Sequence, residues 1–187
     1  MGSFLVFVAV VVVIAALVIG AYNSLVRRRM ETQNAWSQIT VQLKRRYDLI
    51  PNLVETVRGY AGHERETLER VVQARNQAIQ AQGPAQQASA ENVLTGALKS
   101  LFAVVEAYPD LKANENFRAL QEELTATENR IGFARQHYND VASQYNGALQ
   151  SFPTNLVARS LGFNEAEFFH IEGAEAEAIL AAPQVKF

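Results

Sequence analysis

Three histidines are the residues of this chain best suited to metal or acid–base chemistry. His63, His137 and His170 lie far apart, and none has a second ligand at the spacing of a metal site. A zinc-protease motif would place another histidine four residues after His63, where the chain has a threonine. The histidines therefore predict no metal centre.

Carboxylates and hydroxyls form no catalytic pattern either. Glu122, Glu123 and Glu128 suggest a carboxylate-bridged metal site, but such sites need Glu-x-x-His units facing the interior of a bundle. None of these three glutamates begins such a unit, so they are typical of a solvated acidic face. No serine stands in the Gly-x-Ser-x-Gly turn of a nucleophile elbow, and no glycine-rich loop follows a strand. We therefore expect no enzyme activity and no cofactor.

Some polar residues are candidates for a polar lock, meaning buried side chains whose hydrogen bonds fix the register of packed helices. Arg46 falls on the apolar stripe of the first helical region, where it could pair with Glu123 or Glu128. The alternative is that the stripe drifts and Arg46 extends its charge to water. Asn139 and Asn146 are the other candidates, because each follows a tyrosine and the two pairs are seven residues apart.

The elements that must position these side chains are almost all helical. Apolar residues at spacings of three and four predict a first helical region that ends near Gln82, before Gly83 and Pro84. Pro51 lies inside this region and either kinks one long helix or separates two helices. The apolar stripe keeps its phase across Pro51, which favours the kink.

Three further helical segments are expected. The second helix covers about residues 86–107, and the third begins after a cap at Asn114 and is stopped by Pro153. A short helix at about residues 155–161 and an extended tail at residues 183–187 complete the chain. The predicted fold class is all-α, with an N-terminal transmembrane helix that continues into a long antiparallel helical bundle.

The expected helices differ in length, which leaves apolar surface to be covered. The first region would be about 80 Å long, the second helix about 33 Å and the third about 57 Å. Either the first region folds back at Pro51 to make a fourth column, or part of the apolar seam is bare, as at many interfaces. We therefore expect the chain to self-associate through the end of the third helix, at Tyr138, Val141, Tyr145 and Phe152.

Residues 4–22 form an uncharged apolar run. As a helix this run is about 28 Å long, close to the hydrocarbon thickness of a bilayer. A cleaved secretory signal is the alternative, but the basic segment before it and the cleavage site of small residues are both missing. The sequence therefore predicts a single-pass transmembrane anchor at residues 1–26 and a bundle domain at residues 27–187.

The end of the apolar run is expected at the membrane surface. Tyr22 lies where an interfacial aromatic residue belongs, and Arg27, Arg28 and Arg29 follow it. Basic residues there attract anionic lipid, by about 1 kcal/mol for each. The positive-inside rule places the bundle on the cytoplasmic side of the membrane, and the periplasmic side is the alternative.

Composition limits the classes of partner. Residues 31–187 hold 14 basic and 19 acidic residues, because only the three arginines precede them among 17 basic residues, and their net charge is −5. A nucleic-acid-binding protein would usually carry a basic face, so we expect no nucleic acid partner. The chain has no cysteine, which excludes thiol catalysis and disulfides.

Four segments resemble the LemA family of bacterial membrane proteins: residues 22–29 (YNSLVRRR), 35–64 (AWSQITVQLKRRYDLIPNLVETVRGYAGHE), 128–146 (ENRIGFARQHYNDVASQYN) and 151–163 (SFPTNLVARSLGF). Thr40 departs from the pattern, where an acidic residue is expected. The resemblance implies an N-terminal membrane helix with its short N-terminus outside the cytoplasm, a helical bundle and no established catalytic activity. Relatives in magnetosome-forming bacteria suggest, by analogy, a role in shaping membranes.

Two functions of different class remain open. The first is a non-catalytic scaffold that self-associates on the bacterial inner membrane and organises or shapes it. The second is an adaptor that recruits another membrane protein, such as a protease or an envelope-biogenesis factor. Both use membrane lipid and an apolar seam, so the sequence does not separate them.

Overall fold

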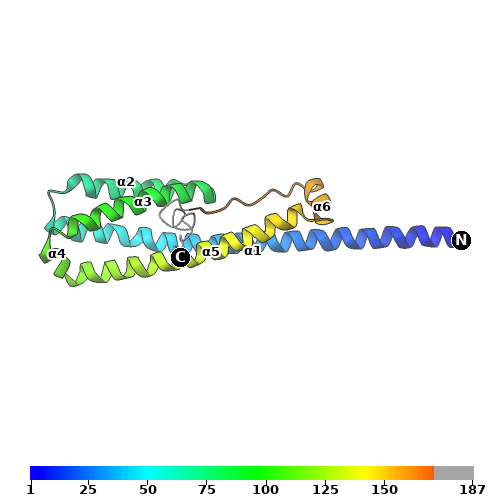
Figure 1. Ribbon diagram of the computed structural model, residues 1–187, viewed down its shortest axis with the longest axis horizontal. Coiled ribbons are helices and arrows are strands. Elements are labelled where there is room, and N and C mark those ends of the chain that lie inside the picture. The colour runs from blue at the N-terminus through cyan, green and yellow to red at the C-terminus, as the bar shows by residue number, and fades with distance from the viewer. Residues whose placement is uncertain (171–187) are drawn as a thin grey trace, which may run out of the picture. The chain divides into compact units, whose positions relative to one another are not determined.

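The computed structural model describes residues 1–170, and every regular element among them is an α-helix (Figure 1). The predicted all-α class is confirmed. The expected tail at residues 183–187 lies outside the described residues. In chain order the helices are α1 (Gly2–Tyr60), α2 (Arg65–Gln80), α3 (Gly83–Val105), α4 (Pro109–Ala113), α5 (Glu115–Gln150) and α6 (Thr154–Ser160).

The contacts divide the chain into two compact units. Of the described residues, unit 1 contains 1–38 and 134–167, and unit 2 contains 39–133 and 168–170. The helices α1 and α5 each contribute to both units. The apolar run therefore belongs to the same unit as the second half of α5 and α6.

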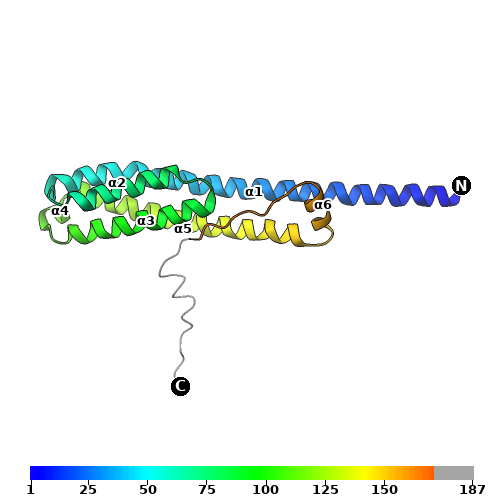
Figure 2. The same ribbon diagram turned by 90° about the horizontal axis from the view of Figure 1, so that it is seen from above.

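Unit 2 is a bundle of antiparallel helices. The helices α2 and α3 lie beside the cyan part of α1, and the first part of α5 runs along the same group in both views (Figures 1 and 2). Each helix turns one apolar face inward, as the spacing of three and four predicts. The core is made by Ile39, Leu43, Ile50, Leu53 and Val57 on α1, Leu68 and Val71 on α2, Leu94, Leu98 and Leu101 on α3, and Phe117, Leu124 and Ile131 on α5.

The first helical region is divided at residues 61–64, which the sequence analysis did not predict. The helix α1 continues through Pro51 to Tyr60, and the chain reverses before α2 begins at Arg65. Backbone bonds from Ala61 N to Val57 O (2.8 Å) and from Glu64 N to Ala61 O (3.0 Å) form the turn. The reversal makes α2 the fourth column of unit 2. Of the two alternatives at Pro51, the structure has one helix that passes through the proline, as the phase of the apolar stripe favoured, and the reversal lies after it.

Pro51 leaves one carbonyl of α1 without its helical hydrogen bond. Proline has no N–H, so the Tyr47 carbonyl four residues earlier has no donor at position 51. The guanidinium of Arg75, on α2, donates from Nε to this Tyr47 oxygen at 2.7 Å. A side chain of the neighbouring helix thus replaces the missing backbone donor, so the helix continues with its carbonyl paired.

The starts of α3 and α5 follow capping rules. Pro84 occupies the first turn of α3, where a missing N–H costs nothing, so α3 begins at Gly83 instead of the expected residue 86. Asn114 caps α5 as predicted, because its Oδ1 accepts a hydrogen bond from Phe117 N at 3.0 Å. The Asn114 amide also donates to Tyr60 Oη at 3.0 Å and so connects the start of α5 to the end of α1.

Unit 1 packs the second half of α5 and α6 against α1. The rings of Trp36 and Tyr138 lie 5.4 Å apart. Further along, a cluster of buried residues from all three helices contains Leu25, Tyr145, Leu149, Val157 and Ala158. After α6 the chain turns at Gly162, whose φ of +69° favours glycine, and Phe163 N donates to Ala158 O at 3.1 Å.

The apolar run occupies the N-terminal part of α1. By length and composition this helix contains one window apolar enough to cross a membrane, and none of that window is buried. The run is continuous with the residues of α1 that pack in unit 1.

The hydrogen bond from Arg75 to the Tyr47 carbonyl predicts that the stability cost of replacing Arg75 depends on whether Pro51 is present. Arg75→Met in the native chain should lower the free energy of unfolding by about 1–2 kcal/mol, because a partly buried acceptor loses its donor. In a Pro51→Ala background, the new alanine supplies its own N–H and the same change should cost less. Urea denaturation in detergent, followed by circular dichroism, measures both, and equal costs in the two backgrounds would contradict the assignment.

Candidate functional site

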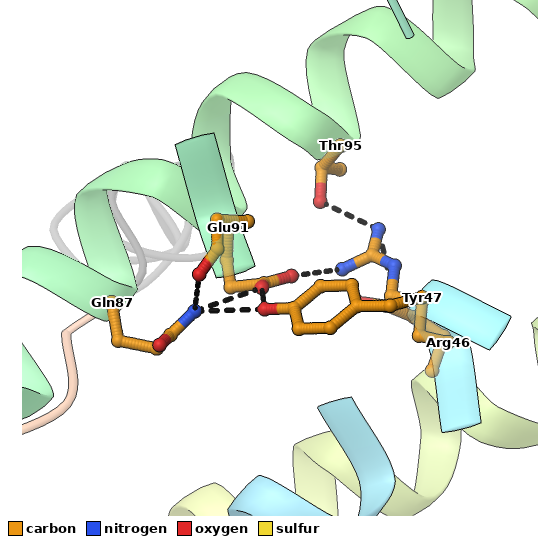
Figure 3. Close-up of polar contacts among 7 residues, drawn as sticks. Arg46, Tyr47, Gln87, Glu91 and Thr95 are labelled. Atoms are coloured by element: carbon orange, nitrogen blue, oxygen red, sulfur yellow. Dashed lines mark hydrogen bonds and ion pairs between the residues drawn. The ribbon is translucent and has the colours of Figure 1, made fainter. Parts of the chain in front are cut away.

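The most buried charged group of unit 2 is an ion pair between α1 and α3. Arg46 is 4% exposed and Glu91 is fully buried, and Nη1 of Arg46 lies 2.8 Å from Oε2 of Glu91 (Figure 3). Nη2 of Arg46 donates to Thr95 Oγ1 at 2.9 Å and lies 3.3 Å from Oε2 of Glu128 on α5. The guanidinium therefore joins three helices.

Two further polar side chains form hydrogen bonds with Glu91. The Tyr47 hydroxyl donates to Oε1 of Glu91, and the Gln87 amide nitrogen is 2.8 Å from the Tyr47 oxygen and 3.2 Å from the same carboxylate oxygen (Figure 3). Gln87 also donates to Ala78 O at 3.0 Å, which adds α2. We call Arg46, Tyr47, Gln87, Glu91 and Thr95 the Arg46 network.

The electrostatics of this network follow from its burial. Burial raises the pKa of Glu91 above its ordinary value, and the charge of Arg46 opposes that shift. Burial, together with the neighbouring carboxylate, also raises the pKa of Tyr47, so its hydroxyl stays protonated and remains a donor. Each of the five side chains is hydrogen-bonded to another member of the network, and Arg46 and Gln87 also have partners outside it. Such an arrangement fixes helix register.

Part of this network was predicted from the sequence. Arg46 is buried as the polar-lock reading predicted, and Glu128 is one of its partners, whereas Glu123 pairs with the exposed Arg45 at 2.8 Å. The main partner, Glu91, was missed. A signal was present, because Gln87 and Glu91 continue the spacing of four and three that Leu94 starts on α3.

The expected self-association seam is largely covered within the chain. Tyr138 and Tyr145 are 2% and 3% exposed, and their hydroxyls donate to backbone oxygens of Glu167 (2.6 Å) and Asn164 (3.1 Å). The expectation that these two tyrosines lie bare is therefore wrong, because residues 163–167 lie over them. Burial raises the pKa of Tyr138 to about 12. Val141 is half-buried, and Phe152 alone of the four is highly exposed.

The two asparagines of the polar lock have different surroundings. Asn146 is buried and bonds the backbone of Ala166 twice, since its Nδ2 donates to Ala166 O (2.9 Å) and its Oδ1 accepts from Ala166 N (2.8 Å). It therefore fixes the segment at residues 163–167 against α5 instead of fixing two helices. Asn139 is half-buried.

The residues expected at the membrane interface lie at the end of the apolar run in unit 1. The Tyr22 ring packs edge-on against Phe163, with centroids 6.0 Å apart. Arg27 and Arg29 are exposed and Arg28 is half-buried. Within residues 1–170, no group of three His, Asp or Glu side chains is placed to hold a metal ion.

The Arg46 network predicts a non-additive pair of substitutions. Arg46→Met should lower the free energy of unfolding by about 3–5 kcal/mol, because Glu91 would remain buried without its partner. Adding Glu91→Leu should recover part of that loss, although Tyr47 and Gln87 then lose an acceptor.

The exposed pair of Arg45 and Glu123 is the matched control for that experiment. Arg45→Met should change the free energy of unfolding by less than about 1 kcal/mol, because its side chain and that of Glu123 are nearly half exposed. Additive losses in the Arg46 and Glu91 variants, measured by urea denaturation in detergent, would contradict the role given to the network.

Comparison with known proteins agrees with this architecture. The LemA family model matches residues 35–187. "Protein LemA" of Metamycoplasma hominis is 30% identical over 161 residues, which cover 84% of this chain and 72% of that protein. "Magnetosome protein MamQ 2" of Paramagnetospirillum magneticum is 27% identical (94% of this chain, 74% of that protein), and "Magnetosome protein MamQ" of Magnetospirillum gryphiswaldense is 25% identical (88% and 70%). The family match and the identity to Protein LemA together establish that the chain belongs to the LemA family.

Proposed function

We propose that this protein is a non-catalytic scaffold, anchored in the bacterial inner membrane by α1, that self-associates to organise or shape the membrane. The observation that carries the proposal is the continuity of α1 within unit 1. Residues 4–20 of its apolar run are exposed, and the same helix packs in the cluster with α5 and α6 from Ala21 onward. A helix that is both anchor and packed element holds unit 1 at a fixed distance from the bilayer.

The non-catalytic part of the proposal is supported by the use that the chain makes of its reactive groups. The buried charged and phenolic groups of the Arg46 network are bound to one another, and Tyr138 and Tyr145 of unit 1 donate to backbone carbonyls. The family and its relatives, among them named magnetosome proteins, suggest a membrane-associated protein of non-enzymatic type.

Self-association is the finer part of the proposal, and its surface differs from the one first expected. Tyr138 and Tyr145 are covered, so contacts between copies have to use other surfaces. Anchoring favours such contacts, because it confines copies to one plane and raises their effective concentration. Inside the bilayer, the uncharged faces of residues 4–22 associate by packing instead of by the hydrophobic effect.

Electron microscopy of the full chain in lipid vesicles tests the scaffold. Ordered arrays or extended patches are expected, because copies confined to the membrane would associate repeatedly. Discrete small particles would contradict the scaffold and favour the adaptor. In the control variant Val12→Asp with Val13→Asp, two charges in the apolar run cost about 5–7 kcal/mol of insertion, so assemblies should be lost together with membrane binding. Val41→Asp, at an equally exposed valine outside the run, should leave both intact.

The cytoplasmic orientation is a further part of the proposal, supported by the three arginines after the run. The chain has no cysteine, so a single one can be introduced at exposed Ser3 or Ser143. A membrane-impermeant thiol reagent should label the Ser3→Cys variant in intact cells and the Ser143→Cys variant only after the cells are opened. Labelling of the Ser143→Cys variant in intact cells would overturn the orientation.

A further inference from the structure

The turn between α5 and α6 exposes an unusual concentration of large apolar side chains. Phe152, Leu156 and Leu161 are 80%, 61% and 55% exposed, whereas Val157 and Ala158 of the same short helix are buried. Thus α6 packs one apolar side against unit 1 and leaves a second apolar side in the open. Exposed apolar clusters of this kind usually mark a contact surface. Among residues 23–170, the other exposed large apolar side chains are scattered, at Met30, Val41, Tyr60, Val72, Ile79, Val93 and Phe133.

We call the end of α5, the turn and α6, at residues 141–164, the α5–α6 hairpin. This hairpin is almost without charge. Between Asp140 and Glu165 the only charged residue is Arg159, which lies exposed on α6. Apolar side chains beside a single cation are suited to a surface that is apolar inside and carries phosphate outside, as a lipid bilayer does. Glu165, the first acidic residue after the hairpin, bonds to Gln150 at 2.8 Å.

The register of α5 on α1 places this hairpin at the end of the apolar run. Trp36 faces Tyr138 in an antiparallel pair, so equal steps on the two helices remain level. Phe152 lies fourteen residues after Tyr138 (152 minus 138), and the residue fourteen before Trp36 is Tyr22 (36 minus 14). The packing of Leu149 and Val157 on Leu25 agrees with this register, and Figures 1 and 2 both show α6 beside α1.

The level of the hairpin can be compared with the dimensions of a bilayer. Tyr22 ends a run that matches the hydrocarbon thickness, and Leu25 lies about 4.5 Å beyond it along the helix. The polar headgroup layer on each side of the hydrocarbon is about 5–7 Å thick. When residues 4–22 span the membrane, α6 therefore lies within the headgroup layer, with Phe152 at the edge of the hydrocarbon.

We propose that the α5–α6 hairpin is a second membrane contact, in which Phe152, Leu156 and Leu161 enter the interface and Arg159 binds lipid phosphate. The inference rests on the proposed anchoring by α1 and adds a second point of attachment in the same unit. Its occupant is the bilayer instead of a second copy of the chain, because the exposed side chains are continuous with the end of the apolar run and the only charge among them is a cation.

Depth-dependent fluorescence quenching in vesicles tests the inference with the full chain. Single cysteines replace Phe152, Ser143 and Val12 in turn, and each carries a nitrobenzoxadiazole label in vesicles of equal parts phosphatidylcholine and phosphatidylglycerol. Lipids with a nitroxide near the headgroup should quench the label at residue 152, and lipids with a deep nitroxide should quench the label at residue 12. The label at residue 143, exposed on α5 of the same unit and nine residues earlier, should stay unquenched and emit as in water.

The outcomes separate this inference from the anchoring on which it rests. Quenching at residue 12 without quenching at residue 152 overturns the hairpin contact and leaves the anchor intact. Absence of quenching at residue 12 overturns the anchor, and if residue 152 is also unquenched the hairpin contact falls with it. A blue-shifted but unquenched label at residue 152 shows that protein covers the hairpin, which also overturns the inference.

A second measurement tests whether the quenching depends on the neighbouring leucines. With the label at residue 152, the additional substitutions Leu156→Ser and Leu161→Ser should reduce quenching by the shallow nitroxide, because the labelled hairpin then loses both of its remaining exposed apolar side chains. Far-UV circular dichroism confirms that these variants remain helical, as expected for side chains that are already exposed. Unchanged quenching in the doubly substituted chain would contradict the proposal.

Discussion

Unit 2 depends on one buried guanidinium. Arg46 leaves water to lie among α1, α3 and α5, and such a charge is tolerated only where a carboxylate and further hydrogen bonds replace its hydration. Glu91 supplies the carboxylate and Thr95 an additional acceptor, while Tyr47 and Gln87 satisfy the remaining oxygen of Glu91. A helix that slipped by one turn would separate these groups. Apolar faces alone tolerate such slips more easily, so the network selects one register among several that would bury similar area.

In unit 1, buried polar side chains find their hydrogen-bond partners in backbone groups. The segment at residues 163–167 runs over the end of α5, and its carbonyls accept from Tyr138, Tyr145 and Asn146. The buried side-chain hydroxyl and amide groups and the backbone carbonyls of this non-helical segment thereby satisfy each other's hydrogen bonds. Gly162 sends the chain into this path, and Phe163 reaches Tyr22 as a result. The end of the anchor is therefore fixed by contacts that come from the far end of the sequence.

The sequence predicted the helices better than their connections, and the reasons are physical. Apolar spacing on α5 and the cap at Asn114 are local signals, and both are confirmed. The reversal at residues 61–64 was missed because apolar residues resume beyond it, at Leu68 and Val71, as if the same helix continued. The bond from Arg75 to the carbonyl that Pro51 leaves unpaired comes from another helix, so no local pattern predicts it.

Partners from distant segments were the other gap. Glu91 was overlooked as a partner because polar residues on an apolar seam are rare, although its position on that seam was visible. The cover of residues 163–167 over the tyrosines had no sequence signature, since backbone carbonyls are present at every residue.

The hydrogen bond from Arg75 to the Tyr47 carbonyl has a consequence for how positions 51 and 75 can change during evolution. While Pro51 is present, Arg75 completes the hydrogen bonding of α1, so a change at Arg75 is penalised. Once Pro51 has been replaced by a residue with an N–H, Arg75 is no longer needed for this bond and is free to vary. Replacing Pro51 first and Arg75 second should therefore cost less stability than replacing Arg75 first. Related chains that lack the proline would be free to place almost any residue at position 75.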